Sequence, residues 1–69
     1  MISVFKTSVK TKIQIKKLRP YIDNMLPNSR WNFDLEDIDK ILRIDSEANV
    51  SLMIIDLLNT HNYTCEELE

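Results

Sequence analysis

The chain has 69 residues, enough for one domain over residues 1–69, because a second domain would have too little chain to bury a core of its own. Its hydrophobic content of 43% and charged content of 29% are typical of a globular protein and not of a disordered one. One cysteine and one histidine exclude an intramolecular disulfide and a four-ligand Cys/His zinc site, and the lack of glycine excludes glycine-rich phosphate loops. No apolar run reaches the length that spans a bilayer, so we expect a cytoplasmic domain without membrane insertion.

Charge is divided unevenly along the chain. Residues 1–30 hold seven of the nine basic residues and one of the eleven acidic residues, so the remainder of the chain is strongly acidic. The net charge of −2 does not suit a nucleic-acid binder, whose affinity comes largely from neutralised phosphates. The basic half is suited to steering toward a protein with an acidic surface.

The first half of the chain predicts a strand followed by a helix. Residues 2–9 are rich in β-branched and aromatic residues without helical spacing, which is typical of a strand. An amphipathic helix over residues 12–26 is predicted by apolar residues at three- and four-residue steps: Ile15, Leu18, Ile22 and Met25. Pro20 inside this helix lacks an N–H, so we expect a bend there. Thr11 precedes the helix, and we expect its hydroxyl to cap it.

The middle of the chain predicts a hairpin and then a second helix. Trp31, Phe33 and Leu35 alternate with polar residues, which indicates a strand with one buried face and an open face left to polar groups. Residues 36–39 are predicted as the turn and residues 40–44 as the returning strand. A helix follows over residues 48–60, with N-cap candidates at residues 46–49.

The end of the chain completes the predicted topology. Asn62 stands where a helix usually ends with a left-handed residue, and residues 63–68 are predicted as a short edge strand. The order strand–helix–strand–strand–helix–strand in so short a chain predicts an α+β fold, the ferredoxin-like βαββαβ sandwich. In this sandwich both helices cover one face of a four-stranded antiparallel sheet.

The sequence resembles the heavy-metal-associated domain family, the fold of small copper chaperones and of soluble modules on metal-transporting ATPases. A bacterial branch of that family opens with Phe-Lys-Thr-x-(Val/Ile)-Lys, followed by Cys-x-x-Cys and a hydrophobic helix that contains proline. Residues 5–10 here read Phe-Lys-Thr-Ser-Val-Lys, and residues 18–20 read Leu-Arg-Pro. The hairpin segments Trp-Asn-Phe-Asp (31–34) and Asp-Lys-Ile-Leu (39–42) are also similar, and Asn-Tyr (62–63) replaces the usual Gly-Tyr or Gly-Phe.

The sequence departs from this family at the metal site. The resemblance aligns the two metal-binding cysteines with Thr11 and Gln14. A threonine hydroxyl is hard, neutral and protonated at pH 7, and a glutamine amide has little affinity for Cu(I). Lys10 and Lys12 flank the loop and repel cations. We therefore expect a stable metal-free turn and no cofactor.

A second interpretation is a residual metal-ion carrier with a non-standard site. Its ligands would come from Thr11, Gln14, His61 and Tyr63, completed by a second copy of the chain. His61 alone is more typical of a partner for a helix dipole, and Cys65 is more typical of a small side chain in or near the core. The carboxylates around the hairpin turn lack the regular spacing of a calcium loop, so we expect them to be solvated.

The preferred interpretation is a non-catalytic, protein-binding accessory module of metal homeostasis. No nucleophile has both a base and an orienting group in the pattern, so we expect no enzyme activity. In metal-bearing relatives docking uses the loop and the helix ends, and the resemblance places a partner-binding surface at Lys10, Lys12, Lys16 and Lys17.

Self-association is expected to be weak or absent. Leu52 and Ile55 form an apolar spot on the second helix, and the last strand offers an unpaired backbone edge to another copy. Glu66, Glu67 and Glu69 place like charges along that edge. We expect a monomer or a weak homodimer.

Overall fold

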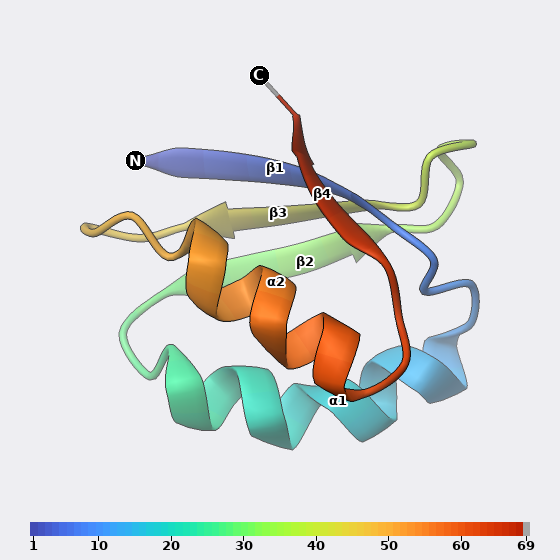
Figure 1. Ribbon diagram of the computed structural model, residues 1–69, viewed down its shortest axis with the longest axis horizontal. Coiled ribbons are helices and arrows are strands. Elements are labelled where there is room, and N and C mark those ends of the chain that lie inside the picture. The colour runs from blue at the N-terminus through green and yellow to red at the C-terminus, as the bar shows by residue number, and fades with distance from the viewer. Residues whose placement is uncertain (69) are drawn as a thin grey trace.

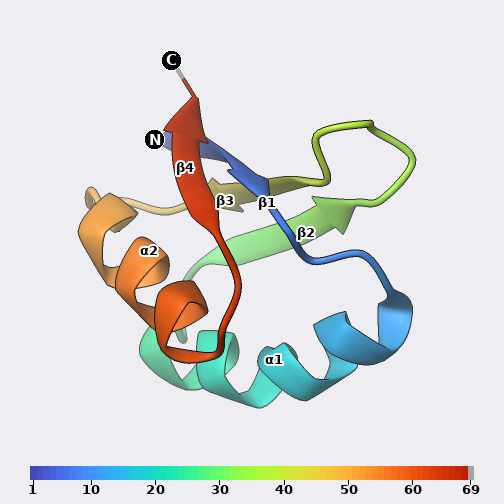
Figure 2. The ribbon, with the colours of Figure 1, turned by 45° about the vertical axis from the view of Figure 1, so that its right-hand side comes forward.

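The computed structural model describes residues 1–68, so residue 69 of the predicted domain lies outside the described residues. The elements follow in the predicted order: β1 (Ile2–Thr7), α1 (Lys12–Met25), β2 (Arg30–Asp34), β3 (Ile41–Asp45), α2 (Ser51–Thr60) and β4 (Cys65–Leu68). The antiparallel sheet has the strand order β2-β3-β1-β4, and both helices lie on the same side of it (Figures 1 and 2). This arrangement confirms the ferredoxin-like sandwich. No helix in residues 1–68 combines the length and the apolar composition needed to cross a membrane.

The core lies between the sheet and the two helices. Phe5 of β1 is paired with Leu42 of β3, and both side chains are fully buried on the face that the helices cover. The helices contribute side chains at three- and four-residue spacing, which places them on one stripe of each helix. These are Leu18 and Ile22 of α1 and Ile54 and Leu58 of α2. The amphipathic patterns of the sequence therefore predict the core.

The open face of the sheet is less polar than predicted. Asn32 and Asp34 lie on it as expected, because they alternate with the half-buried Trp31 and Phe33 on β2. The same alternation on the other strands places Ile2 of β1 and Leu68 of β4 on this face, and both are exposed. The prediction considered only β2, and the other strands bring apolar side chains to the same surface.

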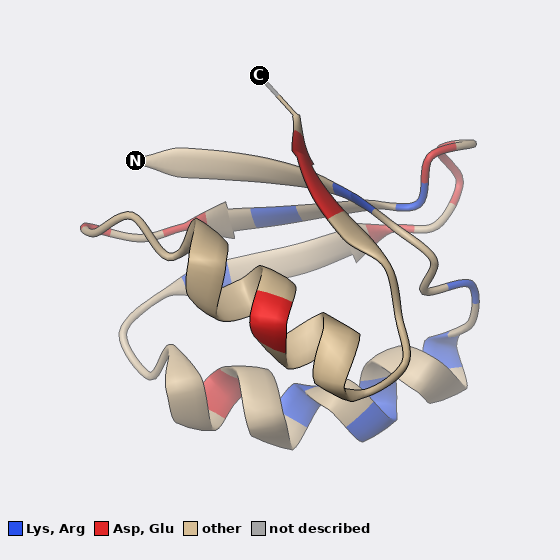
Figure 3. Ribbon diagram, in the orientation of Figure 1, with Lys and Arg blue, Asp and Glu red and all other residues tan. Residues whose placement is uncertain are grey.

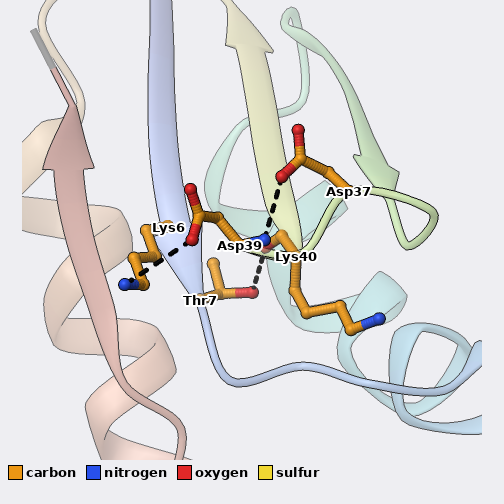
Figure 4. A network of polar contacts seen from close by, with 5 residues as sticks. All are labelled: Lys6, Thr7, Asp37, Asp39 and Lys40. Atoms are coloured by element: carbon orange, nitrogen blue, oxygen red, sulfur yellow. Dashed lines mark hydrogen bonds and ion pairs between the residues drawn. The ribbon is translucent and has the colours of Figure 1, made fainter.

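The β2–β3 hairpin depends on one residue in a left-handed conformation. Lys40, predicted as the first residue of the returning strand, has φ of 51°, so β3 begins one residue later, at Ile41. Such a conformation costs about 1–2 kcal/mol for a residue with a Cβ. The carbonyl of Lys40 accepts a hydrogen bond from the Thr7 hydroxyl at 2.7 Å (Figure 4). The Lys40 Nζ donates to the carbonyl of Leu35 at 2.8 Å. Asp39 next to it pairs with Lys6 at 3.6 Å. These contacts offset the cost in a loop that has no glycine.

The helix boundaries differ from the prediction at two ends. α1 ends at Met25, one residue before the predicted end. The helix α2 begins at Ser51 and not near residue 48, and its N-cap is Val50, so the N-cap candidates at residues 46–49 were wrong. The side chain of Asn49 accepts a hydrogen bond from the Ser51 N–H at 3.0 Å just before the helix. Pro20 lies within α1 without ending it. Asn62 has φ of 68°, which confirms the left-handed residue predicted after α2.

Candidate functional site

The loop before α1 closes on itself through a capping box. The Thr11 hydroxyl accepts a hydrogen bond from the N–H of Gln14 at 3.1 Å, which confirms the predicted cap. In return, the Gln14 side-chain oxygen accepts from the N–H groups of Thr11 at 3.2 Å and Lys10 at 2.7 Å. The part played by Gln14 was not predicted, although threonine followed three residues later by glutamine is the signature of this motif.

This box uses the two positions that the family resemblance assigns to metal ligands. The oxygen atoms of Thr11 and Gln14 are acceptors for backbone N–H groups of their own loop. These N–H groups belong to the start of α1, where a helix leaves donors without partners. The side chains therefore stabilise the helix start, and neither offers the soft, charged sulfur that Cu(I) prefers.

His61 and Tyr63 lie in a groove between the two helices. This α1/α2 groove has a volume of about 890 Å³, and Lys17 and Tyr21 also line it. The His61 ring lies 4.4 Å from the Tyr21 ring, and its Nδ1 lies 2.9 Å from the carbonyl oxygen of Leu57. Because a carbonyl can only accept, Nδ1 carries the proton in this contact and Nε2 is left for other partners. The contact ties His61 to the last turn of α2, as the sequence suggests.

The four residues of the alternative metal site divide between two places. His61 packs on Tyr21, which lies seven residues beyond Gln14, or about 10 Å along the axis of α1. His61 and Tyr63 line the α1/α2 groove, whereas Thr11 and Gln14 belong to the capping box. Within residues 1–68, no group of three or more His, Cys, Asp or Glu residues is placed to hold a metal ion.

Cys65 faces the core from β4. It is paired with Thr7 of β1 and packs half-buried against the hydrophobic core. Burial and then the Glu67 carboxylate raise the pKa of its thiol to about 12. The thiol is thus protonated at neutral pH, which suits neither a nucleophile nor a metal ligand.

The four lysines predicted to bind a partner lie around the start of α1 and face more than one side of it. Lys10, Lys12, Lys16 and Lys17 are all exposed, and none forms an ion pair within residues 1–68. Figure 3 shows the basic residues concentrated on the first half of α1 and the loop before it, and acidic residues on β4 and the hairpin loop. Lys12 and Lys16 point to the β2 side of α1, whereas Lys17 lines the α1/α2 groove.

A second groove lies between α1 and the edge strand β2. This α1/β2 groove has a volume of about 590 Å³, and its lining includes Lys12, Ile15, Lys16, Arg19, Trp31 and Phe33. The Arg19 guanidinium lies 5.0 Å from the centre of the Trp31 ring, within the range of a cation–π contact. Trp31 also donates its indole N–H to Asp23 at 2.8 Å and meets Phe33 edge to face. Trp31 and Phe33 were predicted only as core residues. The groove could not be predicted, because it depends on how α1 and β2 pack.

Comparisons with protein-family models, curated proteins and solved structures gave no match to this chain. The resemblance to the heavy-metal-associated domain therefore stays a prediction that depends on the short motifs quoted above.

Proposed function

We propose that the protein is a metal-free relative of the heavy-metal-associated domain, and that it serves metal homeostasis as a non-catalytic module that docks a protein with an acidic surface. The observation that carries this proposal is the capping box. The positions equivalent to the cysteines hold the loop together by hydrogen bonds, so the loop keeps its shape without a metal. A docking surface built on that loop survives the loss of the ligands.

The charges beside the loop support the second part of the proposal. Lys10 and Lys12 flank the capping box, and Lys16 and Lys17 follow on the next turn of α1. These exposed cations form no ion pair within residues 1–68 and can meet carboxylates of another protein, which raises the association rate and makes it dependent on salt. We place this activity in the cytoplasm, where the single thiol stays reduced.

The metal part of the proposal is tested by equilibrium dialysis with Cu(I), Zn²⁺ and Ni²⁺. We expect no stoichiometric binding by the natural protein and Cu(I) binding by the double variant Thr11→Cys/Gln14→Cys. The double variant Thr11→Ser/Gln14→Glu keeps the capping pattern and serves as the control. Tight binding of any of the ions by the natural protein would favour the residual metal carrier. A folded cysteine variant that binds no Cu(I) would refute the family alignment.

The docking part is tested with a labelled 20-residue poly-glutamate peptide as the acidic probe. The double variants Lys10→Ala/Lys12→Ala and Lys16→Ala/Lys17→Ala should each weaken binding at least fivefold, and added salt should weaken it further. The control Lys6→Ala/Arg30→Ala removes the same charge elsewhere and should change binding less than twofold. Equal losses in all three variants would mean that the four lysines form no specific surface.

The proposed module is a monomer or a weak homodimer. Leu52 is 84% exposed, as the sequence suggests, and Met53 beside it is also exposed, whereas Ile55 packs against the core. The apolar spot on α2 therefore consists of two adjacent side chains, too small an area to stabilise a tight dimer. Sedimentation equilibrium over a hundredfold concentration range should give a mass close to 8.2 kDa.

A further inference from the structure

The α1/β2 groove combines features that belong to different kinds of recognition. β2 has β3 on one side and, within residues 1–68, no strand on the other, so the backbone N–H and C=O groups along its outer edge are available to another chain. The wall of the groove is the stripe of α1 that carries Lys12, Lys16 and Arg19, all exposed and without an ion pair within residues 1–68. Ile15 and the half-buried ring of Phe33 add apolar surface.

The cations along α1 are spaced at intervals that alternate side chains of a β-strand can match. From Lys12 to Arg19 the helix axis rises about 10 Å, and a β-strand covers the same distance in about three residues. Side chains at alternate positions of a strand point to the same face. A strand laid beside β2 would thus bring two or three of its alternate side chains opposite the three cations.

We propose that the α1/β2 groove binds an extended peptide segment that joins β2 as a fifth strand and presents carboxylates at alternate positions to Lys12, Lys16 and Arg19. This inference rests on the proposed function and names the form of the acidic partner. Peptide recognition by strand addition takes its affinity from main-chain hydrogen bonds and its specificity from alternate side chains. The β2 edge supplies the hydrogen-bonding groups, and the basic stripe supplies the specificity.

Two other occupants are less favoured by the same observations. A nucleic-acid strand would meet Asp34 and Glu36, which lie in the groove that continues from Lys12 toward the hairpin loop. The acidic β4 strand of a second copy has the right charge, but Ser51 of α2 holds its Glu67 by a hydrogen bond of 2.7 Å. Both occupants are outcomes of the test.

The probe is an end-blocked heptapeptide that alternates glutamate and valine, and the readout is the emission of Trp31, the only tryptophan in the chain. All glutamate N–H groups point to one edge of the extended peptide and all valine N–H groups to the other. N-methylation of one set should therefore weaken binding at least tenfold, whereas methylation of the other set should change it less than threefold. Equal effects of the two sets would overturn strand addition.

Matched helix variants locate the site. Lys16→Glu, on the groove wall, should weaken binding of the heptapeptide at least tenfold, and Lys17→Glu, on the neighbouring groove, less than threefold. Equal losses of heptapeptide affinity in Lys16→Glu and Lys17→Glu would overturn the α1/β2 groove as the peptide site. They would not refute the proposed docking of an acidic surface, because poly-glutamate binding depends on all four lysines together. If a ten-residue oligouridylate bound more tightly than the heptapeptide, the proposal of a peptide ligand would be overturned in favour of RNA. A concentration-dependent mass of the free protein that Lys16→Glu abolishes would assign the groove to a second copy.

Discussion

The two edge strands of the sheet, β2 and β4, differ in charge and in the way a helix approaches them. Beside β2, α1 leaves a groove lined by three cations and two aromatic rings. β4 carries Glu66 and Glu67, and α2 packs against it, with Ser51 bonded to the Glu67 carboxylate. An unpaired edge is open to association unless charge or a covering element protects it. β4 has both kinds of protection, whereas β2 has charged side chains beside it but no strand paired to its outer edge within residues 1–68, which supports the proposal that a partner docks at β2.

Both edge strands belong to a sheet that has β1 in its interior. The variant Phe5→Ala should therefore unfold the domain and remove both edges. Phe5 is fully buried between the sheet and both helices, and truncation of such a ring costs about 3–5 kcal/mol. This is close to the total stability of about 3–5 kcal/mol expected of a domain of this size. We expect the variant to be largely unfolded at 25 °C by circular dichroism. Val4→Ala, half-buried on the opposite face, is the control and should stay folded; an unfolding midpoint in urea unchanged by Phe5→Ala would contradict the assigned core.

The thiol of Cys65 reports on how closely β4 is packed. Its pKa is raised to about 12, so the folded protein should react with iodoacetamide at pH 8.5 on the order of a thousandfold more slowly than the protein in urea, where the thiol is half ionised. Since the raised pKa means that the folded state holds this proton more tightly, its contribution to stability is complete below about pH 8.5. It is lost as the pH rises toward 12.

The effect of Glu67 on this thiol provides a control. Glu67→Gln removes the smaller of the two causes of the shift and should speed alkylation of the folded protein modestly. Equal rates for the folded and unfolded protein would mean that β4 does not bury Cys65.

The architecture could be predicted because each element carries its own periodic pattern. Alternation in residues 31–35 and the three- and four-residue steps of α1 are local signals, and the short chain leaves few topologies to connect them. The failures occurred where contacts between distant segments decide the local structure. Lys40 adopts a left-handed conformation that is stabilised by Thr7, 33 residues earlier, and no pattern near Lys40 indicates it.

The site could be predicted only as far as it is local. The Thr11 cap follows from its position before the helix, and Gln14 could have been added from its spacing. The division of the lysines between two grooves could not be predicted, because it depends on which sides of α1 face β2 and α2. Arg19 was not named as a binding residue because its contact with Trp31 joins two elements.

The bond between Ser51 and Glu67 should be measurable as a coupling that is specific to the β4 edge. The Ser51 hydroxyl donates to the Glu67 carboxylate at 2.7 Å and is buried, so we expect Glu67→Gln or Ser51→Ala to lower the free energy of unfolding by about 1.5 kcal/mol. A double-mutant cycle should return about 1 kcal/mol of coupling. The control Glu66→Gln, on the opposite face of β4, should be almost neutral; additive effects of Ser51→Ala and Glu67→Gln would show that the bond contributes nothing.

The smallest expected effect concerns the helix that forms the wall beside β2. Thr11→Ala removes the acceptor for the Gln14 N–H and should cost about 1 kcal/mol, with faster amide exchange confined to the first turn of α1. Because Lys12 belongs to that turn, the variant should also weaken binding of the alternating glutamate–valine peptide by a few-fold and leave the Ser51–Glu67 coupling at the other edge unchanged. Thr11→Ser keeps the hydroxyl and should retain both stability and binding. If Thr11→Ala raised amide exchange in β4 as much as in α1, the two edges would not be structurally independent. The two edge strands would then differ only in charge.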